Sequence, residues 1–565
     1  MKRTLVFAIL NLALVILAAV PAVGQTTYNL DIIWQKAKPE TSVHWQGWGL
    51  AMAGGDLNGD GYADFVSAID SLVSDYPQRY KFIIYIFNGN TTVSTNPSQI
   101  IVYDSIGGQF AFCIADFNKD GYGDLAVGDG GGLGVNDGKG QVNIHYGTGI
   151  DLPNEPDLVI GGYGSATATN FGCALSAGDI NGDGIDDLVV GAPYYGEDYE
   201  RGRVYIYYGD TLGLHAWPDI IINGHQEAGV YEFFGRYVSG KSDFNNDSYD
   251  DLVIGAPGNG AAGSNAGKVY VYHGGSPMDT SAKGWIYGEA SYQRLAAYNV
   301  SSVPADTNGF ASVGWFGTPD WPSTTGSFGR GKCYMIPGDN IGEITPHWTL
   351  TGNDLSDSAL GYWSCSAGYA DNDKLGDFVA GSGSPFRKGR AYLFLRRNMM
   401  KLQPDAYIEG RDGIGGSGDV LGAKVAYAGD VDSCGRDEFL VSNYYADSSN
   451  MIWLCKYTGP DGVTGEPEFR IQNSEFRIYQ NSPNPFSQST IIKYQLTQAG
   501  KTTLKIYNIQ GQLVRVLVNE DKKVGSYEVQ WNGRDNNNNA VSNGIYIYKL
   551  NMGEKSIAKK MTLIR

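Results

Sequence analysis

The chain has 565 residues, including 78 glycines and 38 tyrosines. This length allows several domains, and so much glycine and tyrosine is typical of short, aromatic-rich strands joined by tight turns. The formal net charge of −18 argues against nucleic acid and anionic membrane surfaces as partners, and six cysteines are too few for a disulfide scaffold in a chain of this length.

The N-terminus carries the features of an export signal. Met1-Lys2-Arg3 precedes an apolar run from Leu5 to Val20, and Ala22-Val23-Gly24 supplies small residues for cleavage. We therefore predict a signal peptide over residues 1–24, whose removal takes the formal charge from −18 to −20. The apolar run is short for a spanning helix and no stop-transfer charges follow it, so no transmembrane segment is expected in the mature chain.

A carboxylate-rich loop recurs beyond this segment. Its clearest copy, Asp179-Ile-Asn-Gly-Asp-Gly-Ile-Asp-Asp187, has oxygen-bearing side chains at the first, third, fifth and ninth positions and a glycine at the sixth. A hard cation such as Ca²⁺ takes six to eight oxygen ligands, here including the backbone carbonyl of the seventh residue. Asp, Asn and Gly are also ordinary turn residues, so a single copy would be weak evidence.

Four copies of the loop are complete, and they predict about four structural Ca²⁺ sites. Their first, third, fifth, seventh (carbonyl) and ninth positions are Asp56, Asn58, Asp60, Tyr62 and Asp64; Asp116, Asn118, Asp120, Tyr122 and Asp124; Asp179, Asn181, Asp183, Ile185 and Asp187; Asp243, Asn245, Asp247, Tyr249 and Asp251. Incomplete copies begin at Asp306, Tyr369 and Asp430, and successive first positions lie 60 to 64 residues apart. Such regular spacing predicts a repeat architecture.

Each repeat has the strand content of one propeller blade. In the third repeat, residues 171–178 and 187–193 flank the loop, and 202–209 and 219–222 follow as a third and a fourth strand. Seven such units predict an all-β fold with a seven-bladed β-propeller over residues 25–460. A propeller has to close its ring, and we expect Tyr28 to Ile33 to pair into the blade that also contains Met451 to Cys455.

Repeats three and four resemble FG-GAP repeats. Phe171-Gly172 with Gly191-Ala192-Pro193, and Phe234-Gly235 with Gly255-Ala256-Pro257, carry the resemblance. Roughly residues 30–460 are similar to the seven-bladed propeller of integrin α subunits, which implies calcium loops between the first two strands of certain blades.

The other repeats depart from this pattern. The fifth, from Asp306, has lost the later carboxylates, so we expect no metal there. The sixth has Tyr369 at the first position and the seventh has Cys434 at the fifth, so we expect weak binding or none at either. Cys434 and Cys455 lie in the same repeat, and both a disulfide and two free thiols remain open.

The composition changes after a linker at residues 461–475. Alternating apolar residues beyond it predict a small Ig-like β-sandwich over residues 476–565. The expected strands are Ile491 to Leu496, Thr503 to Tyr507, Leu513 to Val518, Ser526 to Trp531, Ile545 to Leu550 and Ala558 to Ile564.

Pieces of this C-terminal region resemble the sorting domain of proteins exported by type IX secretion. They include Ser482-Pro-Asn-Pro-Phe486, Leu504 to Gly511 and Asn543 to Tyr548. The resemblance implies export by the type IX machinery of a Gram-negative bacterium, followed by release or by attachment to the outer-membrane surface. An ordinary Ig-like binding module is the alternative.

No catalytic motif is evident in the sequence. His-Glu-x-x-His, Gly-x-Ser-x-Gly and Walker-type sequences do not occur, and the glycine-rich segment Gly258 to Gly263 precedes a strand-like segment, Lys268 to Tyr272, in place of a helix. His145 and His273 fall at strand ends and are expected to be structural. We therefore predict that the chain is not an enzyme.

Binding is then the expected function, because the rim loops of a propeller form a broad recognition surface. Aromatic candidates for ligand contact, each of which could instead fill space within or between blades, are Trp45, Trp48, Tyr194, Tyr195, Trp315, Trp321 and Trp363. We predict a secreted or cell-surface adhesion protein for an extracellular glycan or protein. The alternative is a secreted, lyase-like, polysaccharide-degrading enzyme on a calcium-bearing propeller.

Overall fold

The computed structural model describes residues 26–564, apart from 29, 38–48, 50, 76–77, 105–109, 132–138, 163–168, 197–200, 226–230, 297–299, 304–312, 319–330, 338–341, 345, 347, 352–359, 362, 372, 374, 383–388, 397–403, 411–419, 444–450, 460–476, 479–480, 482–483, 497–499, 509, 523–524 and 553–554. The predicted signal peptide and the loop of repeat five, which begins at Asp306, lie outside the described residues. Two compact units divide the chain, Met1–Gly462 and Val463–Arg565. In the described part, no helix is long and apolar enough to cross a membrane.

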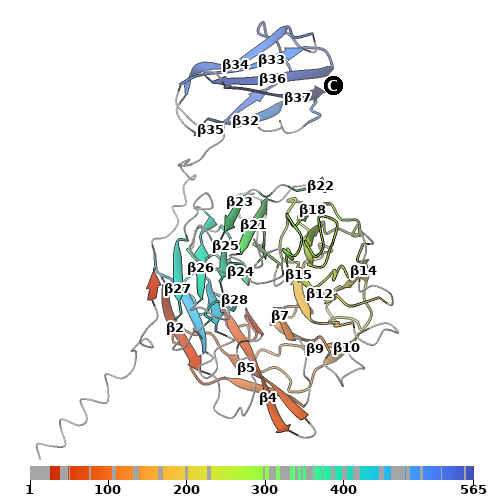
Figure 1. The fold of residues 1–565 in the computed structure, drawn as a ribbon, viewed down its shortest axis with the longest axis vertical. Coiled ribbons are helices and arrows are strands. Elements are labelled where there is room, and N and C mark those ends of the chain that lie inside the picture. The colour runs from red at the N-terminus through yellow and green to blue at the C-terminus, as the bar shows by residue number, and fades with distance from the viewer. Residues whose placement is uncertain are drawn as a thin grey trace, which may run out of the picture. The chain divides into compact units, whose positions relative to one another are not determined.

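The described residues of the first unit form seven β-sheets (Figure 1). The first three are β3 (Met52–Gly55), β4 (Asp64–Asp75), β5 (Gln78–Phe87) and β6 (Gln99–Asp104); β7 (Phe110–Ala115), β8 (Asp124–Asp129), β9 (Gln141–His145) and β10 (Leu158–Gly161); β11 (Ala174–Gly178), β12 (Asp187–Ala192), β13 (Arg203–Tyr207) and β14 (Ile220–Asn223). The fourth is β15 (Tyr237–Ser239), β16 (Leu252–Ala256), β17 (Lys268–Tyr272) and β18 (Gly284–Tyr287), with β22 (Gly342–Glu343) parallel to β18.

The remaining three sheets contain the later repeats and the N-terminal strands. They are β19 (Val300–Val303), β20 (Val313–Thr318), β21 (Lys332–Pro337) and β23 (Trp348–Thr351); β24 (Ser364–Gly368), β25 (Asp377–Gly381), β26 (Arg390–Phe394) and β27 (Ala406–Glu409), with β1 (Thr26–Tyr28); β28 (Lys424–Gly429), β29 (Glu438–Ser442) and β30 (Met451–Tyr457), with β2 (Leu30–Ala37). Apart from the addition of β22, neighbouring strands within these sheets are antiparallel.

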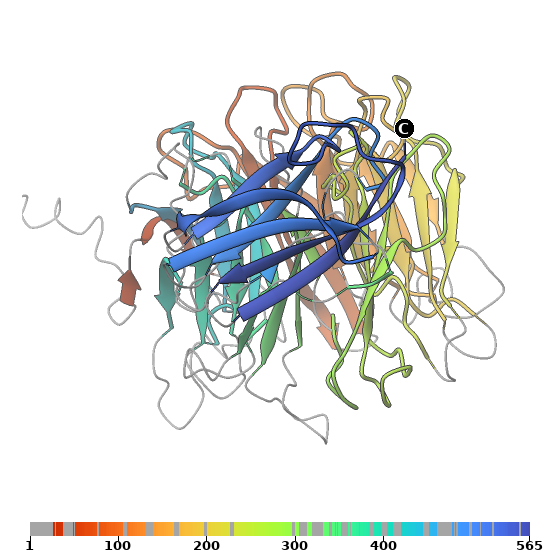
Figure 2. The same ribbon diagram turned by 90° about the horizontal axis from the view of Figure 1, so that it is seen from above.

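The first strands of the seven sheets lie next to one another. β3, β7, β11, β15, β19, β24 and β28 are in contact in that order, and β28 also contacts β3. Figure 1 shows the sheets set around a common centre, and Figure 2 shows the strands of this unit running through its thickness, with connections at its two opposite ends.

The N-terminal strands join the last two sheets. β2 is antiparallel to β30, with Leu30 opposite Tyr457 and Ala37 opposite Met451, which confirms that residues 30–33 join the sheet of the Met451 strand. The prediction was wrong for Tyr28, which lies in β1 and pairs with Tyr407 in the preceding sheet. β1 ends at Tyr28 and β2 begins at Leu30, so one N-terminal segment adds an edge strand to two neighbouring sheets.

Glycine explains why the Phe-Gly and Gly-Ala-Pro pieces occur together. A Cβ atom on Gly191, at the end of β12, would lie 2.1 Å from the carbonyl oxygen of Gly235 in the next sheet. The same approach occurs between Gly128 and Gly172, where the distance is also 2.1 Å. Only glycine permits two backbones to come this close, so the two motifs are the two halves of one contact between sheets.

The second unit is built from two antiparallel sheets. One contains β31 (Arg477–Ile478), β32 (Thr490–Leu496) and β35 (Gly525–Trp531); the other contains β34 (Leu513–Lys522), β33 (Gly500–Asn508), β36 (Gly544–Met552) and β37 (Lys555–Leu563). The six predicted strands are present, each extended by one to four residues or shifted at its ends. Buried Trp531, Tyr548 and Leu504 belong to a core to which both sheets contribute.

Candidate metal centres

The complete loops occupy equivalent places in four successive sheets. Each joins the first strand of its sheet to the second: β3 to β4, β7 to β8, β11 to β12 and β15 to β16. The ninth residue, Asp64, Asp124 or Asp187, begins the second strand in the first three loops, and Asp251 directly precedes β16 in the fourth. Strand pairing therefore fixes both ends of every loop.

Hydrogen bonds from backbone amides to side-chain oxygens stabilise the turns of the loops. In the third copy, Asp179 Oδ1 accepts the Gly182 amide at 2.8 Å and Asp179 Oδ2 accepts the Gly184 amide at 2.8 Å. Asn181 Oδ1 accepts the Asp183 amide at 2.9 Å. These bonds are Asx-turns, in which a short polar side chain caps the backbone a few residues further on.

The same winding recurs in the other three complete loops. The second carboxylate oxygen of the first residue accepts the amide of the sixth, from Gly61 at 3.0 Å, Gly121 at 3.0 Å and Ser248 at 2.8 Å. The sixth residue has positive φ in every copy, including Ser248 at 75°. Glycine adopts this conformation freely, whereas Ser248 adopts it at a cost.

The ninth aspartate is buried in all four loops, with 0% of its surface exposed. Asp187 Oδ2 accepts the Ile180 amide at 2.9 Å, and Asp187 Oδ1 accepts the Gly209 amide, beyond β13, at 3.0 Å. Burial raises the pKa of Asp187 to about 8, and that of the equivalent aspartate in the other three loops to about 7. In Asp64, Asp124 and Asp251 the first and fifth carboxylates of the loop raise the pKa further.

The donor set of each complete loop suits a hard cation. Three carboxylates, one amide oxygen and one backbone carbonyl are oxygen ligands, and a flexible cage of oxygens is what Ca²⁺ prefers. The first, third and fifth side chains are held on one short loop by the Asx-turns, with the fifth side chain exposed in loop three. Asp179, Asn181, Asp183 and Asp187 would hold the ion there, together with the carbonyl of Ile185.

Acidic and thiol groups are gathered more tightly in the two late copies. The described residues contain two clusters in which the ligand atoms lie within 4.8 Å of one another, and neither belongs to a complete loop. One cluster is Asp371, Asp373 and Asp377 of loop six, and the other is Asp430, Asp432, Cys434 and Glu438 of loop seven. Reasoning from the sequence gave these copies little weight because one position of each departs from the pattern. The retained acidic residues at the third and ninth positions were the signal that it discounted.

Loop six is the more buried of these two clusters. Asp377 Oδ2 accepts the Ala370 amide at 3.0 Å and Asp377 Oδ1 accepts the Arg396 amide at 2.8 Å, as the ninth residue does in the complete loops. Burial, followed by the charge of Asp371, raises the pKa of Asp377 well above its usual value. Tyr369 at the first position supplies its amide to Asp437 in the neighbouring loop at 2.8 Å.

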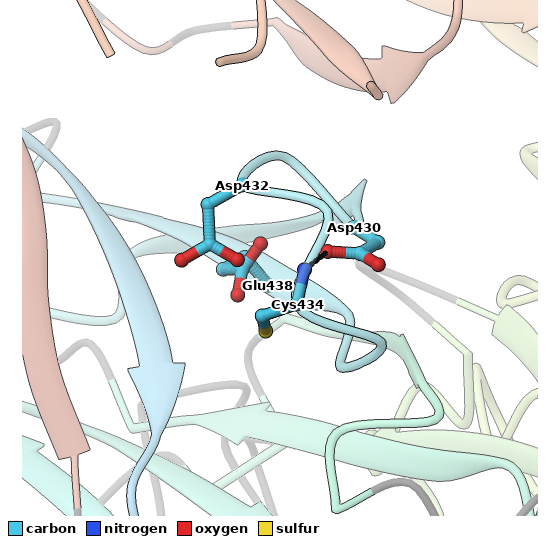
Figure 3. Close-up of side chains that lie close together, drawn as sticks. All are labelled: Asp430, Asp432, Cys434 and Glu438. Atoms are coloured by element: carbon cyan, nitrogen blue, oxygen red, sulfur yellow. Dashed lines mark hydrogen bonds between the residues drawn. The ribbon is translucent and has the colours of Figure 1, made fainter. Parts of the chain in front are cut away.

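Loop seven joins β28 to β29 and keeps the winding of the complete loops (Figure 3). Asp430 accepts the Cys434 amide at 2.9 Å through Oδ1 and the Gly435 amide at 2.8 Å through Oδ2. Glu438 Oε2 accepts the Val431 amide at 2.8 Å, and burial raises the pKa of Glu438 to about 8.

A lysine is paired with loop seven. The Lys456 ammonium forms an ion pair with Asp432 Oδ2, with 19% and 17% of the two side chains exposed. Cys455 of β30 lies opposite Phe439, the residue after the ninth loop position, and Lys456 follows Cys455. In the sheets of the four complete loops, the residues at the equivalent place are Asn88, Tyr146, Tyr208 and His273. Loop seven therefore has a resident positive charge at a position that is aromatic or polar in the other copies.

The structure gives several of the predicted aromatic contacts a packing role. Tyr194 is half-buried and packs edge-on against Phe233, with ring centroids 5.2 Å apart, and the Arg203 guanidinium lies 3.7 Å from the Tyr195 ring centroid. Trp363 is half-buried and has the Lys424 ammonium 4.7 Å from its ring centroid. Trp45, Trp48 and Trp321 lie outside the described residues, as does the side chain of Trp315.

The other candidate groups lie in the strands or in the loops between them. His145 is buried, with Nδ1 at 2.7 Å from the carbonyl oxygen of Pro153, and burial lowers the pKa of His273. The segment after Gly263 is the strand β17, which is not the helix that a dinucleotide site requires. Cys434 is exposed, Cys455 is buried, and both are free thiols.

Comparisons with known proteins agree with the repeats and with the second unit. The FG-GAP repeat model matches residues 171–207 and 237–272, the FG-GAP-like repeat model matches 56–127, and the FlgD Ig-like domain model matches 482–555. The chain is 34% identical to integrin alpha-V of Gallus gallus over 229 residues, which is 37% of this chain and 20% of the relative. It is 30% identical to phosphatidylinositol-glycan-specific phospholipase D of Bos taurus over 334 residues, which is 53% of this chain and 38% of the relative.

These matches leave most of each relative's length unmatched, since the aligned parts span a fifth to two fifths of the two proteins. Among solved structures, PorZ, a surface component of the type-IX secretion system of Porphyromonas gingivalis, is similar with a TM-score of 0.33 and 12% identity, over 88% of this chain and 58% of PorZ. The chain is therefore an all-β protein with FG-GAP repeats related to those of integrin α subunits, followed by an Ig-like domain.

Proposed function

We propose that the first unit is a closed, seven-bladed propeller that is stabilised by Ca²⁺ and binds an extracellular glycan or protein as an adhesion protein. The observation that carries the proposal is one loop, with oxygen ligands at fixed positions, at the same place in four successive sheets. The contacts of the seven first strands, including that between β28 and β3, support a closed ring. A propeller of this kind presents its loops as a recognition surface.

Calcium in these loops is structural in this proposal. Each complete loop concentrates three carboxylates, one of them fully buried, and their mutual repulsion and burial are unfavourable without a counter-ion. A dication cancels that repulsion and locks the connection between the first two strands. Extracellular sites of this type bind Ca²⁺ with Kd of about 10⁻⁴ to 10⁻³ M, a range suited to an environment where calcium is constantly available.

Export is assigned to the two ends of the chain. The segment 1–24 would carry the protein across the inner membrane and then be removed. The second unit, a two-sheet sandwich that matches the FlgD Ig-like domain over 482–555, would be the part that the type IX machinery reads at the outer membrane of a Gram-negative bacterium. The mature protein is then either secreted or attached to the cell surface.

A buried polar cluster in the fourth sheet gives no support to the enzymatic alternative. Glu232 is 6% exposed and accepts hydrogen bonds from Tyr270 and, at 3.0 Å, from the Asn259 side chain, while Lys268 is 1% exposed and lies 4.4 Å from the Tyr270 ring centroid. These groups have the chemical types that an acid–base site uses, but they lie buried against one another within the fourth sheet and its connections. A polysaccharide cannot reach side chains so deeply buried.

One experiment tests the binding function against the enzymatic alternative. Purified protein, in buffer with Ca²⁺, is applied to an array of neutral and acidic glycans and to extracellular matrix proteins, and the bound polysaccharides are followed for formation of unsaturated sugars. Saturable binding without product formation is expected. Formation of unsaturated products would overturn the binding proposal in favour of the lyase, and an absence of saturable binding to every glycan and protein would remove it.

A further inference from the structure

The fifth position of loop seven carries a different kind of ligand atom. Cys434 stands where the complete loops have aspartate, and Glu438 stands at the ninth position. One ligand atom from each of Asp430, Asp432, Cys434 and Glu438 lies within 4.8 Å of the others. Thiolate sulfur is a soft ligand that Zn²⁺ and similar cations take together with carboxylate oxygens, whereas Ca²⁺ takes oxygen alone.

Two oxygens in this cluster are buried without a hydrogen-bond partner, Asp432 Oδ1 and Glu438 Oε1. Glu438 has 0% of its surface exposed, and its other oxygen is held by the Val431 amide. In loop three the corresponding free oxygen of the ninth residue is satisfied, because Asp187 Oδ1 accepts the Gly209 amide at 3.0 Å. Native structures satisfy nearly all buried acceptors, and an ion is one of the partners that does so.

The ion pair with Lys456 leaves these two oxygens in place for a metal. The ammonium contacts Oδ2 of Asp432, so Oδ1 of the same carboxylate stays available. Figure 3 shows the carboxyl groups of Asp432 and Glu438 next to each other, with the Cys434 sulfur beside them. One ammonium offsets only part of the charge of three carboxylates, and the remainder, together with a thiolate, suits a dication.

We propose that loop seven is a binding site for a thiophilic divalent cation of the Zn²⁺ class, with Cys434 Sγ, Asp432 Oδ1, Glu438 Oε1 and Asp430 as ligands and with Lys456 as the group that orients Asp432. The site is chemically distinct from the four complete loops and does not compete with them for Ca²⁺. Binding releases protons to the solvent, because the thiol of Cys434 becomes a thiolate as the metal–sulfur bond forms and any proton on Glu438 is displaced as its oxygen binds.

The test uses the full chain, stripped with EDTA and returned to millimolar Ca²⁺ so that the complete loops are supplied. Cd²⁺, a spectroscopic stand-in for Zn²⁺, is then titrated while the ultraviolet charge-transfer band of a cadmium–thiolate bond is recorded. One equivalent of Cd²⁺ per chain is expected to produce the band, and Zn²⁺ is expected to bleach it by competition. The proposal is overturned if no band forms at stoichiometric Cd²⁺, or if millimolar Ca²⁺ prevents the band.

Three variants locate the site. Cys434→Ser removes the band, whereas Cys113→Ser, which changes a half-buried thiol of β7, leaves it intact. Glu438→Gln keeps an acceptor for the Val431 amide but removes a charged ligand, and is expected to weaken Cd²⁺ binding about tenfold or more while the thiolate band persists at saturation. Binding that is unchanged in Glu438→Gln would mean that Cys434 acts alone as an exposed thiol, and the assigned site would be wrong.

Discussion

Loops one to four and loop seven share the same winding and differ in the side-chain atoms that they offer to a cation. In loop three and in loop seven alike, the first aspartate accepts the amide of the sixth residue at 2.8 Å. Lys456 in the seventh sheet stands at the place that Tyr208 has in the third sheet. The Lys456 ammonium forms an ion pair with Asp432 of loop seven. The winding therefore depends on Asx-turns, while the ligand atoms and their neighbours decide which positive charge balances the loop.

Removal of Ca²⁺ is expected to have the largest effect on stability, through the four complete loops. At about 10 mM free Ca²⁺, each complete loop would stabilise the fold by about 1.4 to 2.7 kcal/mol, and four loops by roughly 6 to 11 kcal/mol. We expect EDTA to lower the Tm of the first unit by roughly 7 to 12 °C in differential scanning calorimetry. Mg²⁺ should restore little of the loss, because it demands a more rigid octahedral site.

The outcome that contradicts a structural role for Ca²⁺ is also plain. If stripped protein melts at the same temperature with and without Ca²⁺, the four complete loops are simple turns that their hydrogen bonds already hold.

A pair of substitutions in loop three separates the buried from the exposed carboxylate. Asp187→Asn places an amide group against backbone donors at a buried site and is expected to cost about 1–3 kcal/mol even in EDTA. Asp183→Asn, at an exposed position, is expected to change the free energy of unfolding by less than about 0.5 kcal/mol in EDTA. In Ca²⁺ the same variant should lack the stabilisation that Ca²⁺ binding at one loop provides. Thermal melts of both variants with and without Ca²⁺ make the comparison, and equal calcium responses in Asp183→Asn and the parent chain would argue against Asp183 as a ligand.

Loop seven should respond to the loss of its lysine and not to calcium. Lys456→Met keeps an apolar stem but leaves Asp432 without its ion pair, and is expected to cost about 1 kcal/mol in Ca²⁺ and in EDTA alike. Lys241→Met is the matched control, because Lys241 is 67% exposed and lies 3.7 Å from Asp186 near loop three. Urea denaturation of the two variants should show a loss for the first and almost none for the second; equal losses would mean that burial of the Lys456 pair has no special importance.

The smallest expected effect distinguishes loop four from the other complete loops. Ser248 has φ of 75° where loops one to three have glycine. Ser248→Gly removes the backbone strain of the folded state, which is stabilising. Glycine also has more conformational freedom in the unfolded chain, which is destabilising, so we expect a net stabilisation of about 0.5 kcal/mol. A denaturant midpoint that does not rise would show that the Ser248 side chain has a compensating contact.

Much of the fold was predictable because it follows from local sequence patterns. The alternating apolar residues of the second unit located six of its seven described strands, and the Gly-Ala-Pro ends located β12 and β16. Topology predicted that an N-terminal strand joins the sheet of the Met451 strand, because a propeller closes by sharing one sheet between the two ends of its repeats, and β2 lies in that sheet. The split between β1 and β2 was not predictable, because both strands are short and each satisfies a different neighbouring edge.

The sites were predicted less evenly. The four complete loops were identified by spacing, and their ligand roles remain predictions. For loops six and seven weak binding or none was predicted, because each departs from the pattern at one position, and that remains a prediction. The folded chain brings ligand atoms of each of these two loops within 4.8 Å of one another. The partner of Asp432 is 24 residues away on another strand, so no local pattern could have indicated it.

The sequence by itself determined the strand periodicity, the repeat length, the turn chemistry of the loops and the two-unit composition, because each of these is a property of neighbouring residues. Tertiary structure alone decided which backbones approach at glycine, as Gly191 does to Gly235, and which charge meets which loop. The physical reason is that burial and ion pairing depend on atoms brought together across strands. A lysine on β30 and a cysteine after β28 become one site only when the sheet forms.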